Sequence, residues 1–155
     1  MVDNENNEFI YKYKTALKEA IYTRKSTRIY EDKRIEKNDK EKLKSFVKSI
    51  NLPFKQNIEI ILSPENNKLP VFLINANTDF AAVISKNSIL DKTKAGFVGE
   101  IFVLYCESIG ISTCWVGAFR KKQAYNIIFP ESGKISSNNN YQANFFKETE
   151  THYQK

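Results

Sequence analysis

The sequence predicts an α+β fold in which a small, mostly antiparallel sheet packs around a long central buried helix, with flanking helices. Two observations indicate this. Three segments carry apolar residues at helical spacing, and short runs rich in β-branched residues lie between the second and third segments. The 155 residues are enough for one domain with a hydrophobic core. The expected order is helix, helix, three strands, helix, strand and helix.

The first two helices are expected in the N-terminal third of the chain. Residues 8–22 place apolar side chains three and four positions apart, and the cations that follow suit the negative end of a helix. Residues 38–50 repeat the pattern, with Asn38 as a candidate N-cap and Glu41 three positions later. The strands expected next cover residues 57–62, 71–74 and 80–84.

The longest expected helix covers residues 91–109, where apolar side chains occupy most of the circumference. Such a helix is buried in the core or in a subunit interface. Gly110 is suited to end it. A short strand over residues 113–116 and a helix over residues 120–128 complete a domain that we expect to span residues 1–130.

The remaining residues, 131–155, are rich in Ser and Asn and show no sustained period. They are predicted to form a polar C-terminal tail that is irregular or embraces a partner, with one short segment around residues 141–146.

Composition excludes several kinds of site. His152 is the only histidine and Cys106 and Cys114 are the only cysteines, so a Ser-His-Asp triad or a zinc site is improbable. An enzyme with these residues would take its chemistry from a bound cofactor. The net charge of +6 favours an anionic partner: nucleic acid, an acidic membrane face or a phosphorylated small molecule. The polar, acidic N-terminus and the free thiols predict a cytoplasmic location.

The stretch TRKSTR, residues 23–28, combines three cations with three hydroxyl residues at the expected end of the first helix. By itself it is typical of a solvated surface. A second motif changes this interpretation. EAIYTRKSTRIYEDKRI (residues 19–35) and AGFVGEIFVLYCESIGISTCWVGAF (residues 95–119) resemble, in the same order, two motifs of the nitroreductase superfamily. The second is most similar to the compact TM nitroreductase branch.

The resemblance implies an FMN-dependent NAD(P)H oxidoreductase that acts as a homodimer. Hydride would pass through flavin N5 to nitro or quinone-like acceptors in a ping-pong reaction, with a small-molecule acceptor as partner and no nucleic acid or membrane. The flavin carries the chemistry, so no catalytic side chain and no metal are expected. The implied contacts are Arg24 and Lys25 with the FMN phosphate and ribityl chain, Ser26 with the ribityl or pyrimidine side, Arg28 with N1 and O2, and Val116, Gly117 and Ala118 with the ring near N5.

Two other functions stay open. The C-terminal strand of the family is not recognisable in residues 131–155, which favours a shortened, non-catalytic relative that binds flavin or a protein partner without turnover. A basic nucleic-acid-binding module is the other alternative. For single residues, Trp115 belongs to the core or lines the pocket, and Glu100 pairs with a cation across a dimer or faces a wet edge.

Overall fold

The computed structural model describes residues 4–28, 34–50, 52, 55, 57–64, 79–116, 126–127 and 141–150. Of residues 4–7, 10 and 141–150 it describes the backbone alone.

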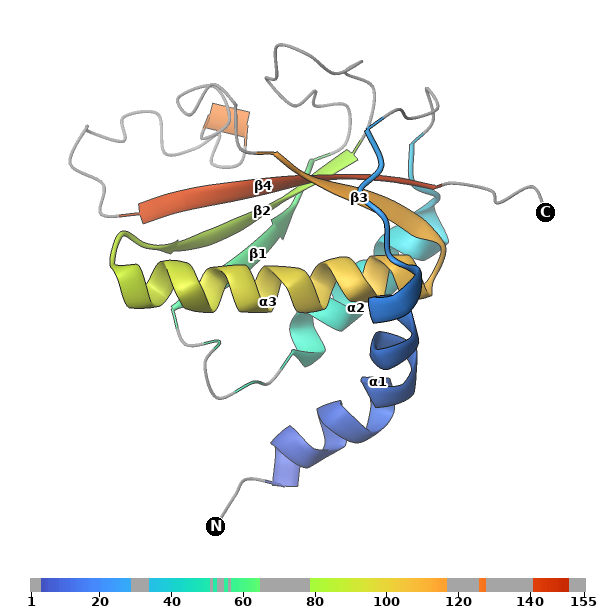
Figure 1. The fold of residues 1–155 in the computed structure, drawn as a ribbon. Coiled ribbons are helices and arrows are strands. Elements are labelled where there is room, and N and C mark those ends of the chain that lie inside the picture. The colour runs from blue at the N-terminus through green and yellow to red at the C-terminus, as the bar shows by residue number, and fades with distance from the viewer. Residues whose placement is uncertain are drawn as a thin grey trace.

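Three helices and four strands form the described fold (Figure 1). The helices are α1 (Asn4–Thr23), α2 (Lys37–Ser49) and α3 (Ile89–Ser108), and the strands are β1 (Ile58–Leu62), β2 (Asp79–Lys86), β3 (Ile111–Val116) and β4 (Tyr141–Glu150). The sheet has the order β1-β2-β4-β3, and every neighbouring pair is antiparallel. In Figure 1, α3 runs along one face of this sheet, and α1 and α2 lie on the same side. The predicted α+β class, with a small antiparallel sheet against a long helix, is confirmed.

Most predicted elements are present, with shifted ends. The helices expected at 8–22, 38–50 and 91–109 are α1, α2 and α3, and the strands expected at 57–62, 80–84 and 113–116 are β1, β2 and β3. The strand predicted at 71–74 lies outside the described residues, as does the helix predicted at 120–128 except for residues 126–127, which are helical. The capping prediction was wrong, because α2 begins at Lys37 after Glu36, which makes no side-chain capping bond.

The largest correction concerns the C-terminal region. Residues 141–150, predicted as mostly irregular, form β4, which pairs with β2 on one side and β3 on the other. The predicted segment at 141–146 is only the first part of this strand. β2 is buried along seven of its eight residues, so both of its edges must find backbone partners. Tertiary pairing of this kind overrides a polar sequence with weak strand propensity. The division of the chain at residue 130 stays a prediction.

Aromatic side chains join the three helices. Phe46 of α2 is fully buried and stacks on Tyr105 of α3, with ring centroids 3.8 Å apart and ring planes 1° from parallel. Tyr13 of α1 meets both rings edge-on, at 4.9 and 5.6 Å. These contacts hold the middle of α1 against α2 and α3, and so they set the direction in which α1 leads to the basic stretch. None of the helices in the described part of the chain is long and apolar enough to cross a membrane.

Candidate functional site

The basic stretch lies along the outer edge of β3. α1 ends at Thr23, and the backbone N–H of Arg24 still donates to the carbonyl of Ala20 at 2.9 Å. The chain then becomes extended. Ser26 forms a parallel bridge with Thr113, and the N–H of Thr27 donates to the Thr113 carbonyl at 3.1 Å.

This pairing brings together two motifs that are almost 90 residues apart in the sequence. Because the stretch runs parallel to β3, Arg28 lies toward the end of β3 that Val116 closes. Paired strands are about 4.8 Å apart and rise about 3.3 Å per residue, so Ser26 and Val116 are separated by about 10 Å along the edge. A side-chain contact accompanies the bridge, since the Ser26 hydroxyl donates to Sγ of Cys114 at 3.4 Å.

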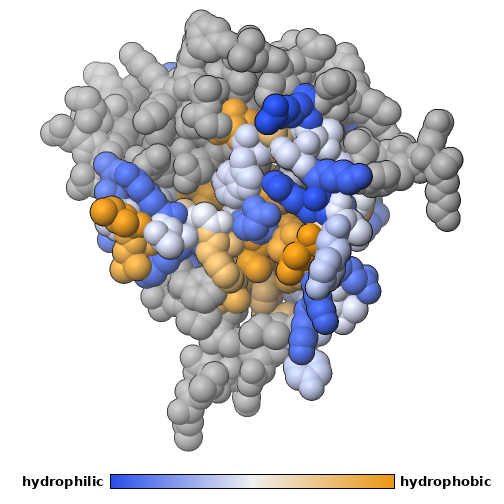
Figure 2. All heavy atoms as spheres, in the orientation of Figure 1, coloured by the Kyte–Doolittle hydropathy of each residue, from blue (hydrophilic) through white to orange (hydrophobic). Residues whose placement is uncertain are grey.

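The predicted site residues differ in exposure. Lys25, Ser26 and Arg28 are exposed, Arg24 is half-buried, and Val116 is buried. Gly117 and Ala118 lie outside the described residues. Figure 2 shows hydrophilic side chains gathered over the region of this stretch and β3, beside an apolar area over α3. The structure therefore presents three cations on one edge, which is an arrangement that suits an anion.

Arg24 is held in an unusual position. Its Nε lies 3.8 Å from Oε1 of Glu100 on α3, which is too far for a hydrogen bond. This Nε is buried and has no hydrogen-bond partner in the part of the chain that the structure describes. The other oxygen of Glu100, Oε2, accepts a 2.9 Å hydrogen bond from the indole Nε1–H of Trp115.

Arg24, Glu100 and Trp115 thus form one polar group. Glu100 pairs with a cation of its own chain, and its side chain is 43% exposed. Trp115 is half-buried and packs against the core. Glu100 was visible in the sequence as the one acid inside a long apolar window, and that interruption was the available signal for a polar role. Its partners could not be named, because they come from the stretch that follows α1 and from β3.

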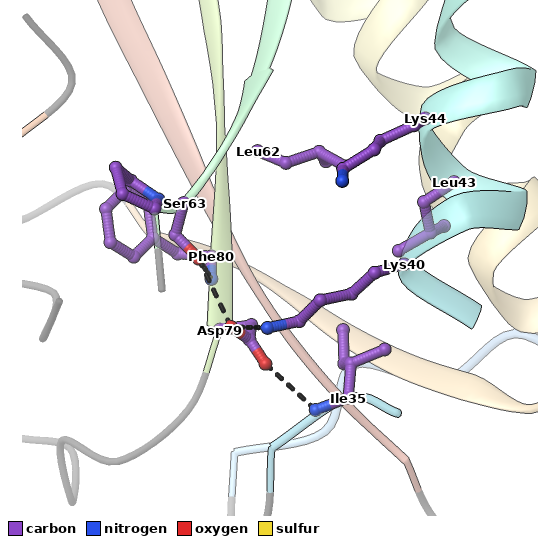
Figure 3. Close-up of a pocket in the computed structure, with 9 residues that line it drawn as sticks. Ile35, Lys40, Leu43, Lys44, Leu62, Ser63, Asp79 and Phe80 are labelled. Carbon is purple, nitrogen blue, oxygen red and sulfur yellow. Dashed lines mark hydrogen bonds and ion pairs between the residues drawn. The ribbon is translucent and has the colours of Figure 1, made fainter. Parts of the chain in front are cut away.

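The structure adds a second anchor that sequence analysis missed. Asp79, at the start of β2, is 3% exposed and accepts a hydrogen bond from the backbone N–H of Ile35 at 2.9 Å. Nη1 of Arg34 and Nζ of Lys40 lie 3.2 and 3.0 Å from its Oδ1. Figure 3 shows Asp79 pointing toward Lys40 and Ile35, with Ser63 on its other side. The chain is therefore tied to β3 at Thr27 and to β2 at Arg34 and Ile35.

A cavity of about 250 Å³ opens beside this anchor, between α2 and the ends of β1 and β2 (Figure 3). Its lining comprises Ile35, Lys40, Leu43, Lys44, Leu62, Ser63, Pro64, Asp79 and Phe80. None of the predicted cofactor residues lines it, so it is distinct from the β3 edge. Within the described residues, no group of three or more His, Cys, Asp or Glu side chains could hold a metal ion.

Comparisons with known proteins agree with this geometry. A family model described as "Putative TM nitroreductase" matches residues 16–135. A nitroreductase family protein from Clostridium difficile 630 has a similar structure, with a TM-score of 0.63 and 20% identity over 88% of this chain and 86% of that one. An FMN-dependent nitroreductase from Clostridium difficile R20291 gives a TM-score of 0.59 and 17% identity over 88% of each chain.

A nitroreductase with bound FMN from Bacteroides fragilis gives a TM-score of 0.61 and 11% identity over 90% of each chain. At these identities the solved structures establish the fold alone. No curated protein matches the chain. The family match extends from within α1 past the end of β3 and covers well over half of the sequence. The chain therefore belongs to the TM nitroreductase family of the nitroreductase superfamily.

Proposed function

We propose that this protein is an FMN-dependent NAD(P)H oxidoreductase of nitroreductase type. Family membership supports an oxidoreductase role. Among proteins of similar structure, one is named an FMN-dependent nitroreductase and another was solved with bound FMN. The observation in this chain that carries the proposal is the cationic stretch 24–28, laid along β3, in which the buried Nε–H of Arg24 has no hydrogen-bond partner among the described residues.

The residues present fit the phosphate end of FMN. A phosphomonoester carries nearly two negative charges and accepts several hydrogen bonds, which a guanidinium and an ammonium can supply together. Arg24 has an Nε–H that no other described residue accepts, and the next residue, Lys25, is exposed. When bound, FMN would supply hydride transfer from a nicotinamide donor to a nitro or quinone-like acceptor.

Arg28 is the proposed cation for the ring end of the cofactor. It stands two residues beyond the Ser26–Thr113 bridge, in the direction of Val116. A fixed positive charge there would stabilise the negative charge that a reduced flavin gathers. Ser26 is proposed to bind the ribityl region, and this role requires its hydroxyl to exchange or share the contact with Cys114. Ring contacts by Val116, Gly117 and Ala118 stay predictions.

A homodimer is part of the same proposal. Large apolar side chains are exposed on two helices: Ile21 and Tyr22 on α1 are 61% and 81% exposed, and Ile89 and Leu90 on α3 are 86% and 64% exposed. The two pairs lie at the end of α1 and at the start of α3, and exposed apolar pairs are candidates for contact with another chain. We infer that a second copy of the chain covers one of them.

The rival function, a non-catalytic relative, has lost the observation that motivated it. That observation was an unrecognisable strand after residue 130, whereas β4 occupies the centre of the sheet.

Titration with FMN, followed by quenching of flavin fluorescence, tests the proposed site. Lys25→Ala should weaken FMN binding about tenfold, because a phosphate contact is worth on the order of 1.4 kcal/mol. The matched control is Lys14→Ala, which removes one exposed cation from α1 about 15 Å along the helix axis from Lys25. Equal affinities of the two variants would show that the stretch does not hold the phosphate.

A further inference from the structure

We propose that Glu100 and Trp115 are positioning residues that keep the Nε–H of Arg24 available to an anionic ligand, and so set the affinity of the site for a phosphomonoester. The inference rests on the proposed function in one respect: FMN is the phosphomonoester with which it is first tested. The geometry itself concerns only the three side chains.

Arg24 and Glu100 lie close to each other without forming a hydrogen bond. A carboxylate and a guanidinium attract each other, and a direct charge-assisted hydrogen bond brings nitrogen and oxygen to about 2.8 Å. The observed distance from Arg24 Nε to Glu100 Oε1 is 3.8 Å. The Glu100 side chain is 43% exposed and ends on a flexible stem. A movement of about 1 Å would therefore close the pair.

Trp115 keeps Glu100 from moving closer to Arg24. Oε2 of Glu100 accepts the indole N–H of Trp115 at 2.9 Å. Trp115 belongs to β3 and packs against the buried core, so its indole cannot follow the carboxylate toward α1. The indole N–H therefore restrains Glu100 at a distance from which it attracts Arg24 without occupying its Nε–H.

The Nε–H of Arg24 is a buried donor without a partner among the described residues. A buried N–H without an acceptor is unfavourable, and such groups are rare in proteins. The donor belongs to the residue that precedes exposed Lys25, two positions before the Ser26–Thr113 bridge. An oxyanion that displaces the atoms covering this Nε–H would satisfy it. Glu100 limits the affinity through its negative charge, and Trp115 prevents Glu100 from taking the donor for itself.

The two residues should thus have opposite effects on anion binding. Glu100→Gln keeps an acceptor for the indole and removes the charge, so FMN should bind about threefold to tenfold more tightly at low ionic strength. Trp115→Phe frees the carboxylate to close on Arg24, so FMN should bind about threefold to tenfold more weakly. In the Glu100→Gln background, Trp115→Phe should change the FMN affinity by no more than about twofold, because no carboxylate remains that could move onto Arg24.

The experiment measures FMN affinity by fluorescence quenching for the wild-type protein, these three variants and Glu59→Gln. The last is a matched control, since Glu59 is exposed on β1, at the opposite edge of the sheet from β3. It should bind FMN within about twofold of wild type. A second readout is the Arg24 Nε–H resonance in NMR spectra of the protein without FMN. Inorganic phosphate should shift this resonance in the wild-type protein. Without phosphate, Trp115→Phe should shift the resonance more than Glu100→Gln does.

Three results would overturn the inference. Trp115→Phe could weaken FMN equally in the presence and absence of Glu100, which would mean that the indole acts independently of the carboxylate. Glu100→Gln could leave affinity unchanged or reduce it. The Arg24 resonance could fail to respond to Trp115→Phe. If the urea unfolding curve shows that the Trp115 variant does not fold, the FMN affinity of Glu100→Gln alone tests the inference. Tighter binding than in the wild type then supports it, and unchanged or weaker binding overturns it.

The outcome also separates this inference from the proposed function. If the wild-type protein binds no FMN, the proposed function fails. The inference is then judged with inorganic phosphate as the ligand, and the order of affinities Glu100→Gln, wild type, Trp115→Phe must still hold. If phosphate shows no such order, the inference fails as well.

Discussion

The backbone N–H of Ile35 donates a 2.9 Å hydrogen bond to Oδ2 of Asp79, 44 residues further along the chain. This bond ties the chain that follows the basic stretch to the first residue of β2. Thr27 ties the stretch itself to β3. Anchoring on two strands of one sheet restricts the positions that Lys25 and Arg28 can take. This restriction reduces the loss of conformational entropy when an anion binds.

Asp79 should therefore be important for stability. Asp79→Ala is expected to lower the free energy of unfolding by about 2–4 kcal/mol, because it leaves two cations and a buried N–H without their acceptor. Urea unfolding measures this. Lys40→Met is the matched variant. It should lower the free energy of unfolding by less than Asp79→Ala does, since Arg34 still pairs with Asp79. Equal losses for the two variants would contradict the central place given to the carboxylate.

The aromatic cluster gives a second stability prediction. Phe46→Ala should cost about 3–5 kcal/mol, because a fully buried ring that stacks on Tyr105 leaves a cavity. Tyr11→Ala removes a ring that is 90% exposed on α1 and should change stability by no more than about 0.5 kcal/mol. Thermal unfolding would compare the two, and a small effect at Phe46 would mean that the helices are not held together as described.

Stability should also depend on pH through Tyr105. Burial raises the pKa of Tyr105 above its usual 10.0, with smaller contributions from Tyr13, Cys106 and Asp39. As pH rises above 10.0, the unfolded chain loses this proton before the folded protein does. The folded state then holds more protons, so its stability falls with increasing pH.

Tyr105→Phe keeps the stacked ring and removes the ionisable hydroxyl. Between about pH 9.5 and 11, urea unfolding should show a smaller loss of stability in this variant than in the wild type. Burial lowers the pKa of Lys55, which acts in the opposite direction. Lys55 is present in both proteins, so its effect cancels in the comparison. Parallel pH profiles would contradict the role of Tyr105.

The proposed dimer makes a prediction about mass. Leu90→Glu places a charge on the exposed apolar end of α3, and it should convert the protein to a monomer in sedimentation equilibrium. Lys92→Glu, at an exposed position two residues further along α3, should leave the mass of a dimer. A monomeric wild-type protein would reject the dimer outright.

The helices and three of the strands could be predicted because local patterns determine them. The apolar residues that predicted the helices by their spacing are buried in the structure, as Phe46 and Phe102 show. β4 could not be predicted in full, since its pairing depends on the needs of β2 and β3 rather than on its own residues. The same reason hid the partners of Glu100 and Asp79, which are polar contacts between segments distant in sequence.

At the candidate site, the resemblance of two motifs to one family predicted that the basic stretch and residues 116–118 contact the same cofactor. The bridge between Ser26 and Thr113 brings the stretch and Val116 to the same edge. The sequence analysis assigned Arg24 to a phosphate but did not predict that Glu100 lies next to Arg24. That proximity depends on an orientation between α1 and α3, which no spacing in the sequence encodes.

The central claim is that this chain binds FMN and passes electrons through it. The most direct test is the visible absorbance spectrum of the FMN-loaded protein, recorded anaerobically before and after addition of NADH or NADPH. We expect a yellow protein whose flavin band is lost with one of the two donors and returns when a quinone is added. A protein that binds no added FMN, or one whose bound FMN neither donor bleaches, would contradict the claim.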